Sequence, residues 1–143
     1  QHAAALGQAR VARGGTDLTL VTWSSMLYPA LAAAELAAQQ GVSVEVIDLR
    51  TIWPWDRETV LASAARTGRL LVAHEAVQAA GFGAEVAATV AEELGIRVRR
   101  VGAPRIPVGY ARTLEDAARI SAEKLLQELN LFLSGDGRGR SIA

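Results

Sequence analysis

The sequence contains no cysteine, so it has neither disulfide bonds nor thiolate ligands for a metal. Its formal net charge is zero, because 15 Lys and Arg side chains balance 15 Asp and Glu side chains. Binding to nucleic acid or to an anionic membrane surface requires an excess of positive charge, so we expect neither partner. No apolar run approaches the ~20 residues that cross a bilayer. Residues 1–6 also lack the pattern of a secretory leader, and we expect a soluble, cytoplasmic protein.

Half of the 143 residues are hydrophobic, which is enough for the core of one ordinary domain. We expect residues 1–6 to be a linker or a non-native remnant and residues 7–133 to form the domain. Residues 134–143 are rich in Gly and Arg and are predicted to be a disordered tail.

The stretch from Val44 to Glu75 has the pattern of a strand, a helix and a second strand. Its two apolar runs, at 44–49 and 70–73, are short, as in strands buried on both faces. Between them, Asp56 is placed to cap a helix that stops before Gly68. Two strands joined by a helix in this way lie parallel in one sheet.

The same alternation of strand and helix extends through the domain. Glycines 14 and 15 predict a hairpin whose first strand is an antiparallel edge of the sheet. Thr113, with Asp116 three residues later, predicts the start of a last helix that runs to about Asn130. We therefore predict a three-layer αβα sandwich around a mostly parallel sheet of about five strands, with one antiparallel edge strand.

Polar side chains follow three of the predicted strands: Ser24, then Asp48, then His74 with Glu75. Parallel sheets bind ligands beyond the carboxyl ends of their strands, so we name these four residues the strand-end rim. A hydroxyl, a carboxylate and an imidazole are the groups of a hydrolase triad. However, Ser24 lacks the glycines of a nucleophile elbow, and a helix cap with polar strand ends is the simpler interpretation.

Other candidate sites carry weaker signals. The pair Gly81 and Gly83 could place a helix N-terminus near a phosphate, or it could simply allow a tight helix start. No pair of His residues has the spacing of metal ligands. A cluster of arginines could bind an anion or protect the edge of the sheet. The cluster consists of Arg97, Arg99, Arg100 and Arg105.

Three stretches, in this order, closely resemble the C-terminal domain of the β subunit of thiamine-diphosphate-dependent 2-oxo acid dehydrogenases. That subunit belongs to the E1 component of the pyruvate, branched-chain and acetoin dehydrogenase complexes, and the domain is related to the transketolase C-terminal domain. The stretches are 44–56 with Pro54-Trp55-Asp56, 67–76 with His74-Glu75, and 81–85 with Gly81-Phe82-Gly83.

The resemblance implies a domain for assembly, without catalytic, cofactor-binding or metal-ligating residues of its own. In the parent enzyme, thiamine diphosphate and Mg²⁺ would lie between another domain and the E1 α subunit. The implied partners are the E1 α subunit, a second E1 β subunit and the E2 acyltransferase, and we expect a homodimer when the chain is alone. The candidate interface residues are Trp53, Trp55, Glu92, Glu93 and Phe132.

One alternative of a different class stays open at this point. The chain could be a free-standing domain that binds a small ligand or hydrolyses a substrate with Ser24, Asp48 and His74. A ligand seated on these three residues would favour this alternative, whereas dependence on a larger assembly would favour the first hypothesis.

Overall fold

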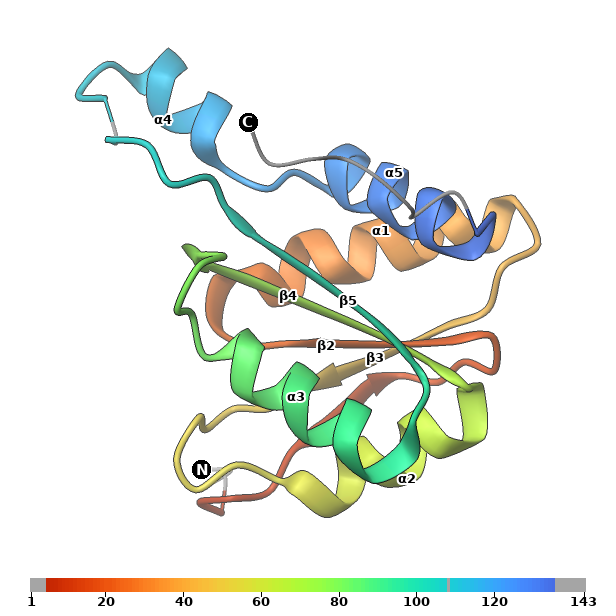
Figure 1. Ribbon diagram of the computed structural model, residues 1–143. Coiled ribbons are helices and arrows are strands. Elements are labelled where there is room, and N and C mark those ends of the chain that lie inside the picture. The colour runs from red at the N-terminus through yellow and green to blue at the C-terminus, as the bar shows by residue number, and fades with distance from the viewer. Residues whose placement is uncertain (1–4, 108, 136–143) are drawn as a thin grey trace.

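The computed structural model describes residues 5–107 and 109–135 and contains one five-stranded sheet between two layers of helices (Figure 1). The strands are β1 (Arg10–Arg13), β2 (Leu18–Thr22), β3 (Val44–Asp48), β4 (Arg69–Val77) and β5 (Arg97–Ala103). The helices are the short 3-10 helix η1 (Ser24–Met26), α1 (Leu27–Gln39), α2 (Arg57–Thr67), α3 (Gly83–Leu94), α4 (Arg112–Ala118) and α5 (Ala122–Leu133).

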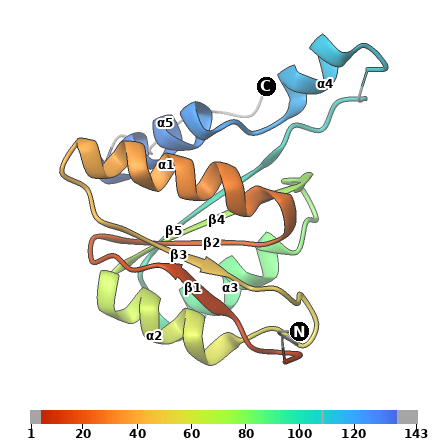
Figure 2. The same cartoon turned by 180° about the vertical axis from the view of Figure 1, so that it is seen from behind.

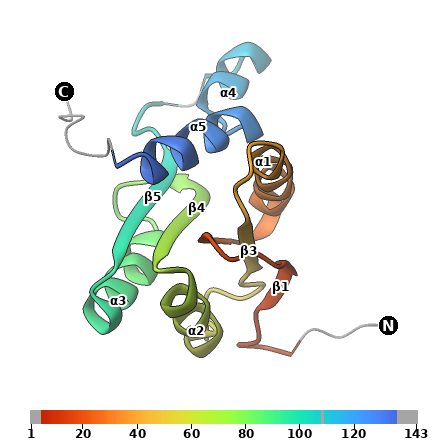
Figure 3. The same cartoon turned by 90° about the vertical axis from the view of Figure 1, so that its right-hand side faces the viewer.

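The strands lie in the order β1-β3-β2-β4-β5, with β2 to β5 parallel to one another and β1 antiparallel to β3. Figure 3 shows α1 and α5 above the sheet and α2 and α3 below it. The predicted αβα sandwich with one antiparallel edge strand is therefore confirmed. No helix in the described part of the chain is both long and apolar enough to cross a membrane.

The predicted hairpin between the first two strands is wrong, because β1 pairs with β3 and not with β2 (Figure 2). The chain crosses over the start of β3 at Gly15, where an added Cβ would lie only 2.2 Å from the Val44 carbonyl carbon. The Asp17 side chain then accepts the Ser43 N–H at 2.7 Å and fixes this crossing. Glycine is needed here for close backbone approach, and not for a tight turn.

The predicted helix α2 is confirmed at both ends. The Asp56 carboxylate accepts the Thr59 N–H at 3.0 Å, as an N-cap does. Gly68 ends the helix in the left-handed conformation, with φ of 71°. Asp56 also accepts the Ala9 N–H at 2.8 Å, so the same carboxylate holds the segment that leads into β1.

The C-terminal helix is interrupted, which differs from the single helix predicted from Thr113. Arg119 is extended, with ψ of 152°, and separates α4 from α5. Ser121 caps α5 by accepting the Lys124 N–H at 3.2 Å, whereas α4 has no side-chain cap. The side-chain cap thus lies at Ser121, eight positions after Thr113, and a new helix begins after it.

The sheet separates two apolar cores. Leu20, Val46 and Leu71 face α1 and α5, whereas Val21, Ile47 and Val72 face α2 and α3. All six side chains are completely buried, as expected for parallel strands covered on both faces.

Replacement of Leu71 by alanine tests this arrangement. Because Leu71 is completely buried in β4, we expect Leu71→Ala to lower the free energy of unfolding by about 2 to 5 kcal/mol through lost burial and a residual cavity. Leu6→Ala, at an exposed leucine, is the matched control and should change it by less than ~0.5 kcal/mol. Denaturant titrations in which both variants lose the same amount would contradict the assignment of β4 as a central strand.

Candidate functional site

The structure places Ser24 and Asp48 at the carboxyl ends of β2 and β3, but His74 and Glu75 lie inside β4, which continues to Val77 beyond the predicted end at residue 73. The side chains of the strand-end rim are not joined into a triad. Asp48 accepts the Arg50 N–H at 3.1 Å and forms an ion pair with Arg10 at 3.5 Å. Ser24 is exposed, in a left-handed turn with φ of 57°, and Glu75 is exposed as well. No hydrogen bond connects Ser24, Asp48 and His74 within the described residues. The carboxylate is thus already paired with a guanidinium, and not with the imidazole.

His74 is the rim residue in the most unusual environment. Its ring is completely buried and stacks on Trp23, with the ring centroids 5.4 Å apart and the planes inclined by 16°. On the opposite side, Cβ atoms added to Gly81 and Gly83 would lie only 2.5 and 2.4 Å from ring carbons. The two glycines therefore make room for the imidazole, which explains their spacing without a bound phosphate.

The environment of His74 favours the neutral imidazole. Neither Nδ1 nor Nε2 has a hydrogen-bond partner among the described residues. Burial lowers the pKa of His74 below its ordinary value of 6.5, and the nearby Arg100 guanidinium lowers it further, although the Ala76 backbone acts in the opposite direction. A neutral ring enclosed between an indole and two glycines is suited to packing α3 against β4, and it is not exposed to a substrate.

An aromatic cluster extends from this ring along the underside of the sheet. Phe82 packs edge-on against Trp23, at 5.9 Å between centroids, and against Trp55, at 6.3 Å. Trp55 thus turns inward onto the core, whereas Trp53, two residues earlier, is 80% exposed. The two predicted interface tryptophans therefore differ in exposure: Trp55 is partly buried against the core, whereas Trp53 is largely exposed.

The other predicted interface residues also differ in their exposure and contacts. Glu93 forms an ion pair with Arg57 of α2, and Glu92 is exposed on α3. Phe132 is only 3% exposed, because it continues the buried stripe of α5 that begins with Leu125 and Leu129. The structure thus places Phe132 in the core of the chain, in contrast to the surface position expected from the sequence.

Most exposed large apolar side chains lie at the same end of the sheet as the rim, distributed from the loop after β3 to α4. Of the large apolar side chains that are exposed in the described residues, only Val11 lies inside a strand, on β1, where it pairs with Ile47 of β3. The others follow the carboxyl ends of β2, β3 and β5 or lie at the end of β4. Leu6 precedes β1, and because β1 runs antiparallel to β3, the start of β1 lies at the same end of the sheet. We call this set the apolar edge: Leu6, Tyr28, Ile52, Trp53, Val77, Ile106, Tyr110 and Leu114.

The apolar edge was not foreseen, apart from Trp53. Tyr28 and Tyr110 carry a signal that could have identified it, because each aromatic ring follows the end of a predicted strand at a position outside any apolar stripe. Figure 1 shows α4 projecting beyond the sheet at this edge, on the left of the view.

The described residues contain no group of three or more His, Cys, Asp or Glu side chains arranged to hold a metal ion. A Mg²⁺-diphosphate site needs oxygen ligands from the protein.

The sequence profile described as "Transketolase, C-terminal domain" matches residues 7–125. This chain belongs to that family. The resemblance seen in the three sequence stretches is therefore confirmed at the level of the domain.

This transketolase C-terminal domain is similar to β subunits of 2-oxo acid dehydrogenases. It is 53% identical over 89 residues to the 2-oxoisovalerate dehydrogenase subunit beta, mitochondrial, of Chaetomium thermophilum, covering 62% of this chain and 19% of that protein. It is 40% identical over 126 residues to the pyruvate dehydrogenase E1 component subunit beta-1, mitochondrial, of Arabidopsis thaliana, covering 85% and 35%. The chain thus spans about a fifth to a third of the length of these relatives.

A solved structure supports the fold independently. A split-gene transketolase, described as an inactive beta4 tetramer, superposes with a TM-score of 0.84 at 28% sequence identity, over 92% of this chain and 44% of that one.

The predicted cytoplasmic location is wrong on this comparison, because the Chaetomium and Arabidopsis relatives are mitochondrial proteins. The prediction depended on the absence of cysteine and of a leader within this sequence. Neither property distinguishes the two compartments, and a transketolase C-terminal domain covers only part of its relatives' length.

Because the His74 imidazole is buried, the stability of this transketolase C-terminal domain should depend on pH. The unfolded chain binds a proton at His74 more readily than the folded chain, so the free energy of unfolding should fall as the pH drops below about 6.5, with a slope of at most ~1.4 kcal/mol per pH unit. His74→Phe keeps a planar ring without titratable atoms and should flatten this slope. Urea titrations between pH 5 and 7.5 measure it, and identical slopes for the two proteins would contradict the assigned environment.

Proposed function

We propose that this chain is the non-catalytic C-terminal assembly domain of the E1 β subunit of a 2-oxo acid dehydrogenase complex. Such a complex decarboxylates a 2-oxo acid oxidatively and transfers the acyl group to the lipoyl group of E2. The similarity to two β subunits of this type supports the proposal. One relative is named for 2-oxoisovalerate and the other for pyruvate, so the proposal extends only to the class of substrate.

The apolar edge is the observation that carries the assembly role. Exposed apolar side chains on a monomer are usually scattered, and a contiguous apolar surface marks an interaction site. Here they surround one edge of the sheet, and Trp53 is 80% exposed there despite its large apolar ring. Tryptophan and tyrosine are also the side chains enriched at the energetic centres of interfaces. We infer that this edge contacts other subunits.

The proposed partners are the E1 α subunit, a second E1 β subunit and the E2 acyltransferase. Thiamine diphosphate and Mg²⁺ would be held by other parts of the parent enzyme. The similar split-gene transketolase is described as an inactive beta4 tetramer. This description is consistent with our proposal that the present chain assembles with other subunits and has no activity of its own. The domain would therefore contribute to activity by positioning the subunits.

The alternative of a hydrolase at the strand-end rim has no support in the geometry. A triad requires a carboxylate that orients the imidazole and an imidazole within reach of the hydroxyl. Asp48 is instead paired with Arg10, and the His74 ring is enclosed by Trp23 and the glycines.

The first test of the proposal is catalytic. The purified 143-residue chain, supplied with thiamine diphosphate and Mg²⁺, should not decarboxylate pyruvate or a branched-chain 2-oxo acid and should not bind the cofactor in calorimetric titrations. Turnover of either acid above a no-protein control would overturn the non-catalytic role.

The second test addresses the apolar edge. In the absence of its partners, the chain should self-associate through exposed apolar surface, so sedimentation velocity should show a dimer or larger species that grows with concentration. Trp53→Ser should shift the profile toward the monomer. Val11→Ser is the matched control, because Val11 is also exposed, at 49%, but is a smaller side chain within the paired strand β1, and it should change the profile less than Trp53→Ser. A strictly monomeric wild-type chain at high concentration would contradict the prediction.

A further inference from the structure

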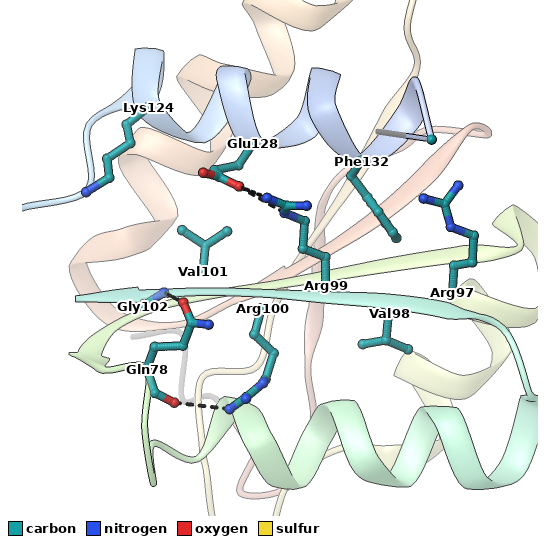
Figure 4. Close-up of a pocket in the computed structure, with 11 residues that line it drawn as sticks. Gln78, Arg97, Val98, Arg99, Arg100, Val101, Gly102, Lys124, Glu128 and Phe132 are labelled. Atoms are coloured by element: carbon teal, nitrogen blue, oxygen red, sulfur yellow. Dashed lines mark hydrogen bonds and ion pairs between the residues drawn. The ribbon is translucent and has the colours of Figure 1, made fainter. Parts of the chain in front are cut away.

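The strand β5 forms the edge of the sheet opposite β1, and a groove follows it beside α5, lined by residues of β5 and α5 together with Gln78 and Gly135 (Figure 4). Within the described residues, β5 pairs only with β4, so its outer side has no partner strand. Gln78 closes the far end of the groove, where its side-chain oxygen accepts the Gly102 N–H at 3.3 Å. The open part extends from Arg97 to Val101, which is roughly 16 Å of extended chain.

Successive side chains of β5 alternate between the side of the strand that faces α5 and the side that faces α3, as a strand requires (Figure 4). Arg97 and Arg99 point toward α5, where Arg97 lies 5.0 Å above the Phe132 ring and Arg99 pairs with Glu128. Arg100 points the opposite way and donates to the Gln78 carbonyl oxygen at 3.0 Å. All three side chains are held on one side of the strand or the other, so none of them covers the backbone edge of β5.

The groove carries a local excess of positive charge in a chain that is neutral overall. Four of its lining residues are cationic and one is an acid, Glu128, which is already paired with Arg99. Arg97 packs on an aromatic ring, and Arg100 binds a carbonyl group. The remaining cation, Lys124, comes from α5.

The opposite edge of the sheet shows that this excess is not a general property of the edge strands. On β1, Arg10 pairs with Asp48 and Arg13 pairs with Glu35. Charged side chains can protect an edge from pairing with a like-charged strand. On β5 the same charges are complementary to a strand that carries carboxylates. The uncompensated charge on β5 therefore calls for an acidic partner.

We propose that the β5 edge binds an acidic, extended segment of a partner protein, which adds to the sheet as a sixth strand. Backbone pairing with the open edge supplies the register, and the carboxylates of the segment meet Arg97, Arg100 and Lys124 on the two sides of the strand. This surface is separate from the apolar edge and does not depend on the proposed role in assembly.

Two other occupants fit the groove less well. A second copy of this chain would bring two sets of arginines together along the shared edge, and like charges opposite one another destabilise a strand pair. The C-terminal residues 136–143 contain two arginines and one aspartate, so they also lack the complementary charge. A single phosphate would not use cations that are spread along ~10 Å of strand and that point to opposite sides of it.

A fluorescein-labelled heptapeptide of alternating glutamate and valine provides the probe, with the full 143-residue chain as the receptor. Fluorescence anisotropy at low salt should show saturable binding that weakens as the salt concentration rises. The charge-reversing double variant Arg97→Glu with Arg100→Glu should weaken binding about tenfold or more. Arg119→Glu is the matched control at an exposed arginine of another surface, and it should bind like the wild type.

Backbone pairing is tested separately with the wild-type protein, so the result does not depend on the folding of any variant. The same peptide with N-methylated amides keeps its carboxylates but cannot pair with β5, and it should bind about tenfold more weakly. Hydrogen exchange should slow at residues 97–101 when the unmodified peptide is bound. The absence of binding, equal binding of the methylated peptide, or displacement by an equal concentration of pyrophosphate would each overturn the proposal.

Discussion

The parallel pairing of β2 with both β3 and β4 is the constraint on which the rest of the structure depends. Because β2 is buried along its whole length, helices must cover both faces of the sheet. Its polar side chains are satisfied internally: Thr19 bonds to Ser63 at 2.6 Å and to Thr67 at 2.8 Å, and Thr22 donates to the Ala73 carbonyl oxygen at 2.9 Å. Parallel pairing also places the carboxyl ends of all four strands at one edge, where the exposed apolar side chains gather.

Local signals in the sequence were sufficient to predict the unit formed by β3, α2 and β4. Asp56 and Gly68 determine the two ends of α2 through contacts within a few residues, so they can be identified from the sequence alone. The pairing of β1 could not be predicted in the same way, because Gly15 acts through its close approach to Val44, 29 positions away in the sequence. The environment of His74 likewise depends on Trp23, which is distant in sequence and joined to it only by the fold.

The two surfaces of the domain differ in chemistry and therefore in the partners that they suit. The apolar edge presents aromatic rings and is suited to a permanent subunit contact, whose burial excludes water. The β5 edge presents cations and an open strand, and it is suited to a polar, salt-sensitive contact with a single segment. The aromatic cluster of Trp23, His74 and Phe82 packs the start of α3 against β4.

Hydroxyl-radical footprinting tests the central claim, that the apolar edge is a subunit interface, most directly. The measurement compares oxidation of Trp53, Tyr28 and Val11 in the isolated chain and in the chain assembled with the proposed E1 partner subunits. Our account predicts strong protection of Trp53 and Tyr28 on assembly and little change at Val11. Equal oxidation of Trp53 and Tyr28 in the two states, with the assembly verified by its mass, would contradict the account.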